Sequence, residues 1–366
     1  RGVHHGAAHG TRADDAVKQL PSEDFFAGLA DKAYKTRSPE SVTFELTYGC
    51  NLRCVHCYNP THRALPHELS TEEIRSILDQ VADLGVVNLT FSGGELFVRP
   101  DVFDIFRHAK GLGFVLHLLS NATRITPTIA ASLQELGFES INLSLYGATK
   151  ATYERVTQVP GSYEPFIRGL DSLAATSLQV VVRMPVMTGN VEEVRQARTL
   201  VERYGFKFQY CMDITPKNNG DPAPLQYRLA PADKVRLDQA MLGLRDVKDT
   251  EACGANGDFI SCLCGRSNFA ITPYGEMNLC IAFPMPRYDL RKGTVKEGWE
   301  VLKQTVDRAQ PNDRYECPTC DVRSRCRQGR SDAWMETGDM SACLPHFKEF
   351  AVLEQRLYER LKPRQV

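Results

Sequence analysis

Residues 50–57 read Cys-Asn-Leu-Arg-Cys-Val-His-Cys, which places Cys50, Cys54 and Cys57 on one short segment. The segment directly follows an apolar stretch, Val42–Tyr48, that is typical of a buried strand. A structural zinc ion takes four ligands, and no fourth Cys or well-placed His follows at finger-like spacing. A [4Fe–4S] cluster bound by three thiolates keeps one iron for an outside ligand, so the spacing predicts a reactive cluster. The alternative is three unrelated buried thiols.

Around this segment, short apolar strands alternate with amphipathic helices from about residue 42 to residue 240. Ser70 and Glu73 form a capping box at the start of one helix, and Gly85 ends that helix. Six β/α units in a row predict a parallel sheet with right-handed crossovers. Since six units are too few for a closed eight-stranded barrel, we expect an α/β fold with a partial (β/α)6 TIM-type barrel, and a doubly wound open sheet is the alternative. The predicted strands are Val42–Tyr48, Val87–Phe91, Phe114–Leu119, Ser140–Ser144, Leu178–Met184 and Lys207–Ile214.

Small polar and charged residues stand where the predicted strands end, which is where barrels of this kind carry their reactive groups. A pair of glycines lets a backbone approach a ligand closely, and a carboxylate just beyond can bind a cation. A buried Arg normally needs an anionic partner, either a ligand or a structural ion pair. Polar residues at strand ends are also common turn formers, which is the alternative for them. The candidates are Ser92, Gly93, Gly94 and Glu95 after the second strand, Ser120 and Asn121 after the third, Ser144 after the fourth and Arg183 near the end of the fifth.

The remaining cysteines are concentrated in the C-terminal part of the chain. A disulfide scaffold is typical of secreted domains, and the N-terminus has no signal-peptide pattern, so clustered metal ligands are the better interpretation. Residues 273–276, Pro-Tyr-Gly-Glu, predict the turn of a hairpin between residues 269–272 and 277–279. The cysteines of this region are Cys253, Cys262, Cys264, Cys280, Cys317, Cys320, Cys326 and Cys343.

Together these motifs resemble the radical S-adenosylmethionine (SAM) superfamily. The resemblance implies that Cys50, Cys54 and Cys57 hold a [4Fe–4S] cluster whose fourth iron is chelated by SAM. It also implies that Gly93-Gly94-Glu95, with Ser92, holds the α-amino group of SAM, and that residues at Ser120, Asn121 and Ser144 contact its ribose and carboxylate. Arg183 is then a candidate partner for the SAM carboxylate. In this family the cluster passes an electron to SAM, and the resulting 5′-deoxyadenosyl radical abstracts a hydrogen atom from the substrate.

The C-terminal cysteines resemble the SPASM extension of the same superfamily, which implies two auxiliary iron–sulfur clusters; a zinc ribbon is the alternative. Cys317, Cys320, Cys326 and Cys343 are the full set for the second cluster. The family pattern has one more cysteine, four positions after Cys326, which completes the first cluster, and this chain has Arg330 there. The first cluster is therefore expected on Cys264 and Cys280 with Cys262 and Cys253, or as a [2Fe–2S] type or a cluster with an open iron.

Cys211 lies in the sixth predicted strand. A free cysteine in a strand is usually a small buried hydrophobe, and the alternative is a thiol that gives a hydrogen atom to a substrate radical. Cys211 shares a strand face with Asp213, two residues further on.

The formal net charge is −1, from 44 basic and 45 acidic residues, so nucleic acid is not expected as a partner. No apolar run approaches the length of a membrane span, and a cytoplasmic protein is expected. We divide the chain into an N-terminal extension (1–40), the barrel (41–240), the SPASM-type domain (250–345) and a C-terminal helix (346–366).

The resemblance favours the modification of a ribosomally made peptide by crosslinking, oxidation or epimerisation. A flavodoxin or ferredoxin would donate the electron. The roughly 40 residues before the first strand are too few for a fused leader-recognition domain, so either a separate recognition protein or recognition without a leader is expected. Alternatives are a dehydrogenase or epimerase acting on a sugar, aminocyclitol or similar metabolite, and a non-enzymatic iron–sulfur electron carrier.

Overall fold

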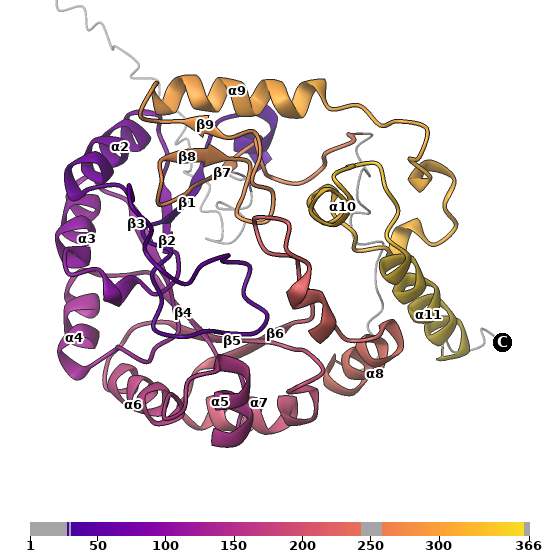
Figure 1. Cartoon of the computed structure of the whole chain (residues 1–366), viewed down its shortest axis with the longest axis horizontal. Coiled ribbons are helices and arrows are strands. Elements are labelled where there is room, and N and C mark those ends of the chain that lie inside the picture. The colour runs from indigo at the N-terminus through magenta and orange to yellow at the C-terminus, as the bar shows by residue number, and fades with distance from the viewer. Residues whose placement is uncertain (1–27, 29–30, 243–257, 362–366) are drawn as a thin grey trace, which may run out of the picture.

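The computed structural model describes residues 28, 31–242 and 258–361, and all structural statements below refer to them. Their strands form one sheet in the order β6-β5-β4-β3-β2-β1-β7-β8-β9. Strands β1 to β6 are parallel, and neighbouring pairs of them follow each other along the chain. Figure 1 shows these strands as an arc with helices along its outer side, which confirms the partial barrel. The strands are β1 (Ser41–Glu45), β2 (Asn88–Ser92), β3 (Val115–Ser120), β4 (Ser140–Ser144), β5 (Val180–Pro185) and β6 (Lys207–Cys211).

Helices connect these strands, and the first of them begins and ends where the sequence predicts. In the first, the Ser70 side chain accepts a hydrogen bond from the backbone of Glu73, and the Glu73 side chain accepts one from the backbone of Ser70, so the capping box is confirmed. Gly85 follows that helix with φ of +87°, a conformation that suits glycine. The helices are α2 (Thr71–Asp83), α3 (Val102–Gly111), α4 (Pro127–Glu135), α5 (Lys150–Thr157), α6 (Tyr163–Ala174) and α7 (Val194–Arg203).

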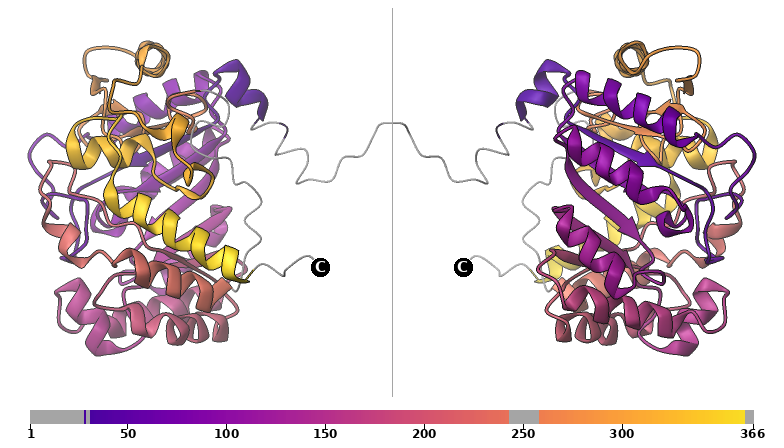
Figure 2. Two further views of the ribbon diagram at one scale, coloured as in Figure 1. Left: turned by 90° about the vertical axis from the view of Figure 1, so that its right-hand side faces the viewer. Right: turned by 90° about the vertical axis from the view of Figure 1, so that its left-hand side faces the viewer.

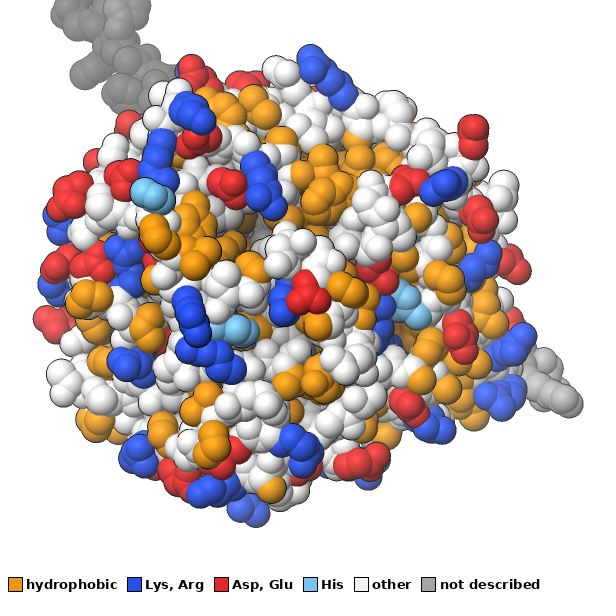
Figure 3. All heavy atoms as spheres, viewed as in Figure 1, with side chains coloured by type: hydrophobic (Ala, Val, Ile, Leu, Met, Phe, Trp, Pro, Cys, Tyr) orange, Lys and Arg blue, Asp and Glu red, His pale blue; other side chains and the backbone are white. Residues whose placement is uncertain are grey.

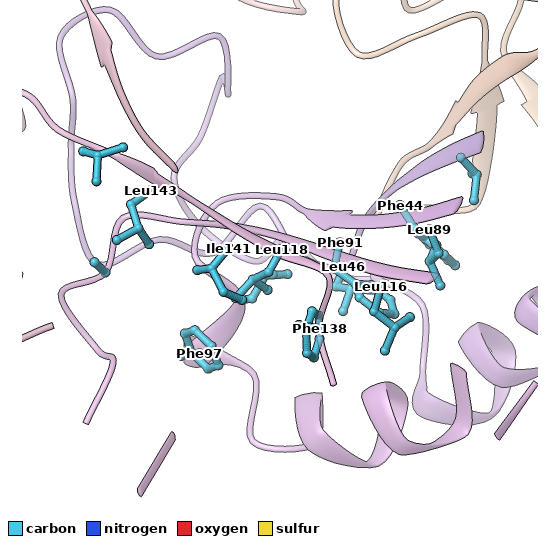
Figure 4. Close-up of a cluster of buried hydrophobic side chains, with 14 of the residues drawn as sticks. Phe44, Leu46, Leu89, Phe91, Phe97, Leu116, Leu118, Phe138, Ile141 and Leu143 are labelled. Carbon is cyan, nitrogen blue, oxygen red and sulfur yellow. The ribbon is translucent and has the colours of Figure 1, made fainter. Parts of the chain in front are cut away.

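The two faces of the arc differ in chemistry. Apolar residues such as Phe44, Leu89 and Leu116 are fully buried, and Figure 4 shows them with their neighbours between the sheet and the helices. The alternate residues point into the barrel and are largely polar. His117 there contacts the hydroxyl of Ser140 through Nδ1 at 2.9 Å. Because one face of the strands is apolar and the other polar, the hydrophobic effect fixes the strands against the helices and leaves the barrel interior open to polar ligands.

The cysteine-rich region extends the same sheet. Strand β7 (Asn268–Ile271) pairs parallel with β1, and β8 (Glu276–Asn278) and β9 (Tyr288–Asp289) follow in antiparallel pairing. The predicted hairpin is confirmed, with φ of +79° at Gly275 in its turn. The parallel pairing of β7 with β1 was not predicted, because it joins residues more than 220 positions apart.

The rest of the C-terminal region closes the open side of the arc (Figure 1). Helix α8 (Pro231–Leu242) follows the last parallel strand of the barrel, and the helices of the C-terminal region are α9 (Val295–Arg308), α10 (Arg330–Thr337) and α11 (Pro345–Leu361). Helix α11 packs on α8, and Figure 2 shows the two side by side. No described helix is long and apolar enough to cross a membrane. Basic and acidic side chains are interspersed over the face drawn in Figure 3.

Candidate active site

The three cysteines of residues 50–57 lie on the loop that leaves the carboxyl end of β1. Cys54 is buried, and Cys50 and Cys57 are half-buried. Burial raises the pKa of all three thiols, that of Cys57 to about 12, and the neighbouring thiolates raise the pKa of Cys54 further. Three thiolates crowded in a buried place destabilise each other unless a cationic group binds them, so the site suits a metal-containing ligand.

Three thiols on one loop match the number of protein ligands in a [4Fe–4S] cluster that keeps one iron for an outside ligand. Among the described residues, no group of three or more His, Cys, Asp or Glu side chains is placed to hold one metal ion.

Hydrogen bonds from α5 and from the end of β3 hold the loop in place. The N–H of Arg53 donates to Thr157 O at 2.9 Å, and the N–H of Val55 donates to Val156 O at 3.0 Å. The amide of Asn121 donates to Asn51 Oδ1 at 3.0 Å and to Cys50 Sγ at 3.8 Å. The carboxyl end of α5 thus supports the loop, a contact that the sequence did not indicate because α5 was not predicted.

Gly93 and Gly94 bring the end of β2 into close contact with the start of the cysteine loop. The N–H of Gly94 donates to Thr47 O at 2.7 Å, and that of Glu95 donates to Gly49 O at 2.8 Å. A Cβ on Gly94 would lie 2.2 Å from Gly49 O, and one on Gly93 would lie 2.4 Å from Thr47 O. Gly93 also has φ of +141°. In this structure the glycines therefore permit backbone to pack on backbone and so join the two motifs.

Glu95 is fully buried and binds the end of β3. Its carboxylate accepts from Ser120 Oγ at 3.0 Å and from the N–H of Asn121 at 2.8 Å. Burial raises the pKa of Glu95, and these donors and the N–H of Phe97 lower it in part. The structure thus brings together the predicted residues after the second and third strands, with buried Ser92 at the end of β2.

Arg183 and Ser144 stand opposite each other on neighbouring strands, in register on β5 and β4. The expectation that Arg183 is buried is wrong. The side chain is exposed on the inner face of the arc, where its Nε donates to Gln209 Oε1 at 3.0 Å. The reason is that this face of an open barrel is not covered by a helix, so a charge there keeps its hydration.

Cys211 ends β6 and is also exposed, so the interpretation as a buried hydrophobe is wrong. It borders a cavity at the edge strand that is lined by Gln209, Asp213 and Lys234 among others. Asp213 lies close enough to act on the Cys211 thiol electrostatically, as expected from their shared face.

A buried carboxyl next to the loop was not among the residues predicted from the sequence. Glu45, at the end of β1, is 2% exposed and accepts from Tyr58 Oη at 2.7 Å and from Tyr48 Oη at 3.3 Å. Burial raises its pKa to about 7. The signal was present, since Glu45 is the only charged residue in the apolar stretch 42–48.

The C-terminal cysteines form two groups. Cys317, Cys320, Cys326 and Cys343 line one small cavity together with Arg330. Cys262, Cys264 and Cys280 form the other: the thiol of Cys264 donates to Cys262, which lowers the pKa of Cys262, and Cys264 also contacts Cys280. Cys253 lies outside the described residues.

Comparison with known proteins agrees with this geometry. Residues 44–201 match the family model described as the radical SAM superfamily. The AdoMet-dependent heme synthase of Methanosarcina barkeri is 27% identical over 330 residues, which cover 83% of this chain and 95% of that protein. The mycofactocin maturase MftC of Mycobacterium tuberculosis is 26% identical over 319 residues, covering 82% of this chain and 80% of that protein.

Two solved structures share the fold. SuiB of Streptococcus suis bound to the precursor peptide SuiA has a TM-score of 0.67 at 14% identity, covering 92% of this chain and 83% of SuiB. The structure of anSMEcpe with AdoMet and the Cp18Cys peptide has a TM-score of 0.63 at 19% identity, covering 88% of this chain and 97% of anSMEcpe. At such identities the likeness concerns the fold.

Proposed function

The chain belongs to the radical SAM superfamily and is an enzyme of that family, and from this premise we propose that it modifies a ribosomally made peptide. The observation that carries the proposal is the meeting of three loops at one edge of the barrel. The three-thiol loop after β1, the Gly-Gly-Glu segment after β2 and the Ser-Asn pair after β3 are joined by hydrogen bonds there. The strand residues on the inner face that lead to these loops are mostly polar.

The proposed roles at this edge follow from the contacts. Family membership implies a [4Fe–4S] cluster and SAM, and when bound they supply a carbon-centred radical. Glu95 and Ser120 hold the loops in register, and the side chain of Asn121 fixes Cys50. No helix covers the exposed side chain of Arg183, and its guanidinium would pair with the SAM carboxylate. The residues assigned to the cluster are Cys50, Cys54 and Cys57, and those assigned to SAM are Ser92, Gly93, Gly94, Glu95, Ser120, Asn121, Ser144 and Arg183.

Two auxiliary iron–sulfur clusters complete the proposal. Cys317, Cys320, Cys326 and Cys343 would bind one, which their common cavity supports. Cys262, Cys264 and Cys280, with Cys253 as a fourth ligand, would bind the other. In this proposal residues 41–240 are the catalytic barrel and 250–345 the auxiliary-cluster domain. Three [4Fe–4S] clusters predict about twelve irons per chain after anaerobic reconstitution, and a [2Fe–2S] first auxiliary cluster predicts about ten.

The ligands of the first auxiliary cluster can be tested separately. Electron paramagnetic resonance (EPR) spectra of Cys253→Ala and of Cys262→Ala should each show this cluster altered, while the signal of the Cys317 group persists. Wild-type spectra in both variants would contradict the assignment. A protein that saturates near four irons and contains zinc would contradict the auxiliary clusters as a whole.

The peptide substrate is supported by the similarity to a mycofactocin maturase over most of both chains. The exposed thiol of Cys211, beside the cavity at β6, is accessible to a bound substrate and is our candidate hydrogen-atom donor. A flavodoxin or ferredoxin would supply the electron, and a separate protein would present the leader of the peptide.

A second candidate is a small-molecule substrate, because the heme synthase relative matches over 95% of its own length. The two candidates differ in the molecule that the enzyme modifies. We would incubate the reconstituted enzyme anaerobically with SAM and dithionite, and add either a short precursor peptide, sought among open reading frames next to the gene, or an iron porphyrin.

For the proposed function we expect 5′-deoxyadenosine to rise with peptide and the mass of the peptide to change. The matched control is Cys50→Ala, which should give neither product. A change only in the porphyrin would establish the second candidate. If no 5′-deoxyadenosine forms under any condition, the proposed radical chemistry is wrong.

A further inference from the structure

Arg330 is the first residue of α10 and is 4% exposed. Its Nη1 donates to Met340 O at 2.9 Å, and its Nη2 donates to Cys317 Sγ at 3.7 Å. The guanidinium carbon lies 5.1 Å from the ring centre of Tyr315 and 5.7 Å from that of Phe259. These contacts hold the cation in one orientation with one edge directed at a cysteine sulfur.

Two aromatic rings pack against the Arg330 guanidinium. Phe259 and Tyr315 meet edge to face, with ring centres 5.1 Å apart and an angle of 89° between the planes. Their faces attract the guanidinium, and their bulk keeps water from it. Where water is excluded, a charge acts more strongly on its neighbours than it does at the surface.

We propose that Arg330 is a positioning residue that raises the reduction potential of the iron–sulfur cluster held by Cys317, Cys320, Cys326 and Cys343. The inference rests on the proposed auxiliary cluster and adds the direction in which this chain tunes it. Reduction adds one electron, taken from a one-electron donor such as a reduced ferredoxin or a substrate radical, and no proton need move. The buried guanidinium stabilises the added negative charge, and its N–H···S hydrogen bond withdraws charge from the Cys317 sulfur.

The exchange of a family cysteine for Arg330 has two consequences. In the pattern that the chain resembles, position 330 supplies a thiolate to the first auxiliary cluster. Here the residue cannot bind iron, so the first cluster must take its fourth ligand from another position, for which Cys253 is our candidate. The Arg330 side chain instead contacts Cys317, a ligand of the second cluster. The exchange thus changes the ligand set of the first site and adds a positive charge beside the second.

The test is an EPR-monitored redox titration of the fully reconstituted enzyme. We expect Arg330→Met to shift the one-electron equilibrium of the Cys317 cluster about tenfold toward the oxidised form, which is about 59 mV lower in potential. Arg330→Lys keeps the charge and should recover part of the shift. Arg266→Met is the matched control, since Arg266 is equally buried but contacts Ile260 O and Asp258, and it should leave this potential unchanged.

If Arg330→Met has a normal iron content and an unchanged potential, the proposed role of Arg330 is wrong, and the proposed auxiliary cluster is not affected. If Cys317→Ala removes no iron from the wild type, the proposed auxiliary cluster fails and the inference with it. If Arg330→Met does not assemble the cluster, Arg330→Gln decides, because it retains N–H donors without the charge. A wild-type potential in Arg330→Gln would then overturn the proposal, and a lowered one would support it.

Discussion

The loop after β1 and the four-cysteine site of the C-terminal region both gather thiols, but the groups around their sulfur atoms carry different charge. On the loop, the donors to Cys50 are neutral: the N–H of Leu52 at 3.4 Å and the amide of Asn121. At the other site the donor to Cys317 is the guanidinium of Arg330.

Carboxylates lie near thiols at both sites. Besides burial, Glu95 acts to raise the pKa of Cys50 and Glu45 that of Cys57, and at the C-terminal site Glu316 acts to raise the pKa of Cys343. A buried cation next to a cluster favours the addition of an electron, and Arg330 is a buried cation that contacts a thiol of the C-terminal site. We therefore expect the loop to suit a strongly reducing cluster and the C-terminal site to suit one that accepts electrons.

The largest expected effect separates the two sites completely. Replacing Cys50, Cys54 and Cys57 by Ala should abolish 5′-deoxyadenosine formation and remove about four irons per chain. The matched variant, with Cys317, Cys320 and Cys326 replaced by Ala, should also lose about four irons but still cleave SAM. Iron analysis and chromatography of the nucleoside measure both. SAM cleavage by the loop variant would contradict the assignment of the reactive cluster.

A smaller effect should come from the contact between the loop and the Gly-Gly-Glu segment. In Gly94→Ala the new methyl group meets Gly49 O, so we expect the free energy of unfolding to fall by about 1–3 kcal/mol and SAM binding to weaken. Gly189→Ala is the control, because nothing lies within 4 Å of its added Cβ. Urea titration and SAM-binding isotherms measure the two effects. Equal stability of the two variants would mean that the contact is not tight.

The buried carboxyl next to the loop predicts a pH dependence. The pKa of Glu45 is raised by burial from 4.5 to about 7, so between pH 5 and pH 7 the folded chain keeps a proton that the unfolded chain has largely lost. The free energy of unfolding should therefore fall as the pH rises through this range, by about 2 kcal/mol. The free energy of unfolding of Glu45→Gln, measured by urea titration at both pH values, should lack this decrease. Parallel slopes for wild type and variant would argue that Glu45 ionises normally.

The smallest effect is expected at the rim of the four-cysteine site. Lys348 lines that region, but its side chain is 46% exposed and pairs with Glu316 at 3.1 Å. Solvent and salt screen such a charge, so Lys348→Gln should lower the potential of the Cys317 cluster less than Arg330→Met does. Redox titrations at low and high salt compare them: the Lys348 shift should vanish in high salt and the Arg330 shift should persist. A larger shift for Lys348 would reverse the comparison.

Much of the fold was accessible from the sequence because the relevant patterns are local. The capping box of Ser70 and Glu73, the turn at Gly275 and the alternation of strands and helices each depend on residues a few positions apart. The expected strand ends differ from the observed ones by a few residues at most: the sixth was expected to reach Ile214 and ends at Cys211. Helix α5 was missed, although its end holds the cysteine loop.

The exposure of Arg183 and Cys211 could not be predicted in the same way. Both stand in strands, where an apolar neighbourhood in the sequence suggests burial. Whether a strand residue is covered depends on the elements that reach its face, and here the inner face of the arc has no covering helix.

The sequence by itself determined which cysteines are candidates for a common cluster, since spacing limits which thiols can share one, and it determined the order of strands and helices. Only the tertiary structure decided which distant groups meet: Asn121 and Cys50, Glu95 and the end of β3, and Arg330 and Cys317. The physical reason is range. Hydrogen-bonded turns and apolar periodicity act within a few residues, whereas these contacts form only after sheet pairing and helix packing have closed loops of 13 to 71 residues.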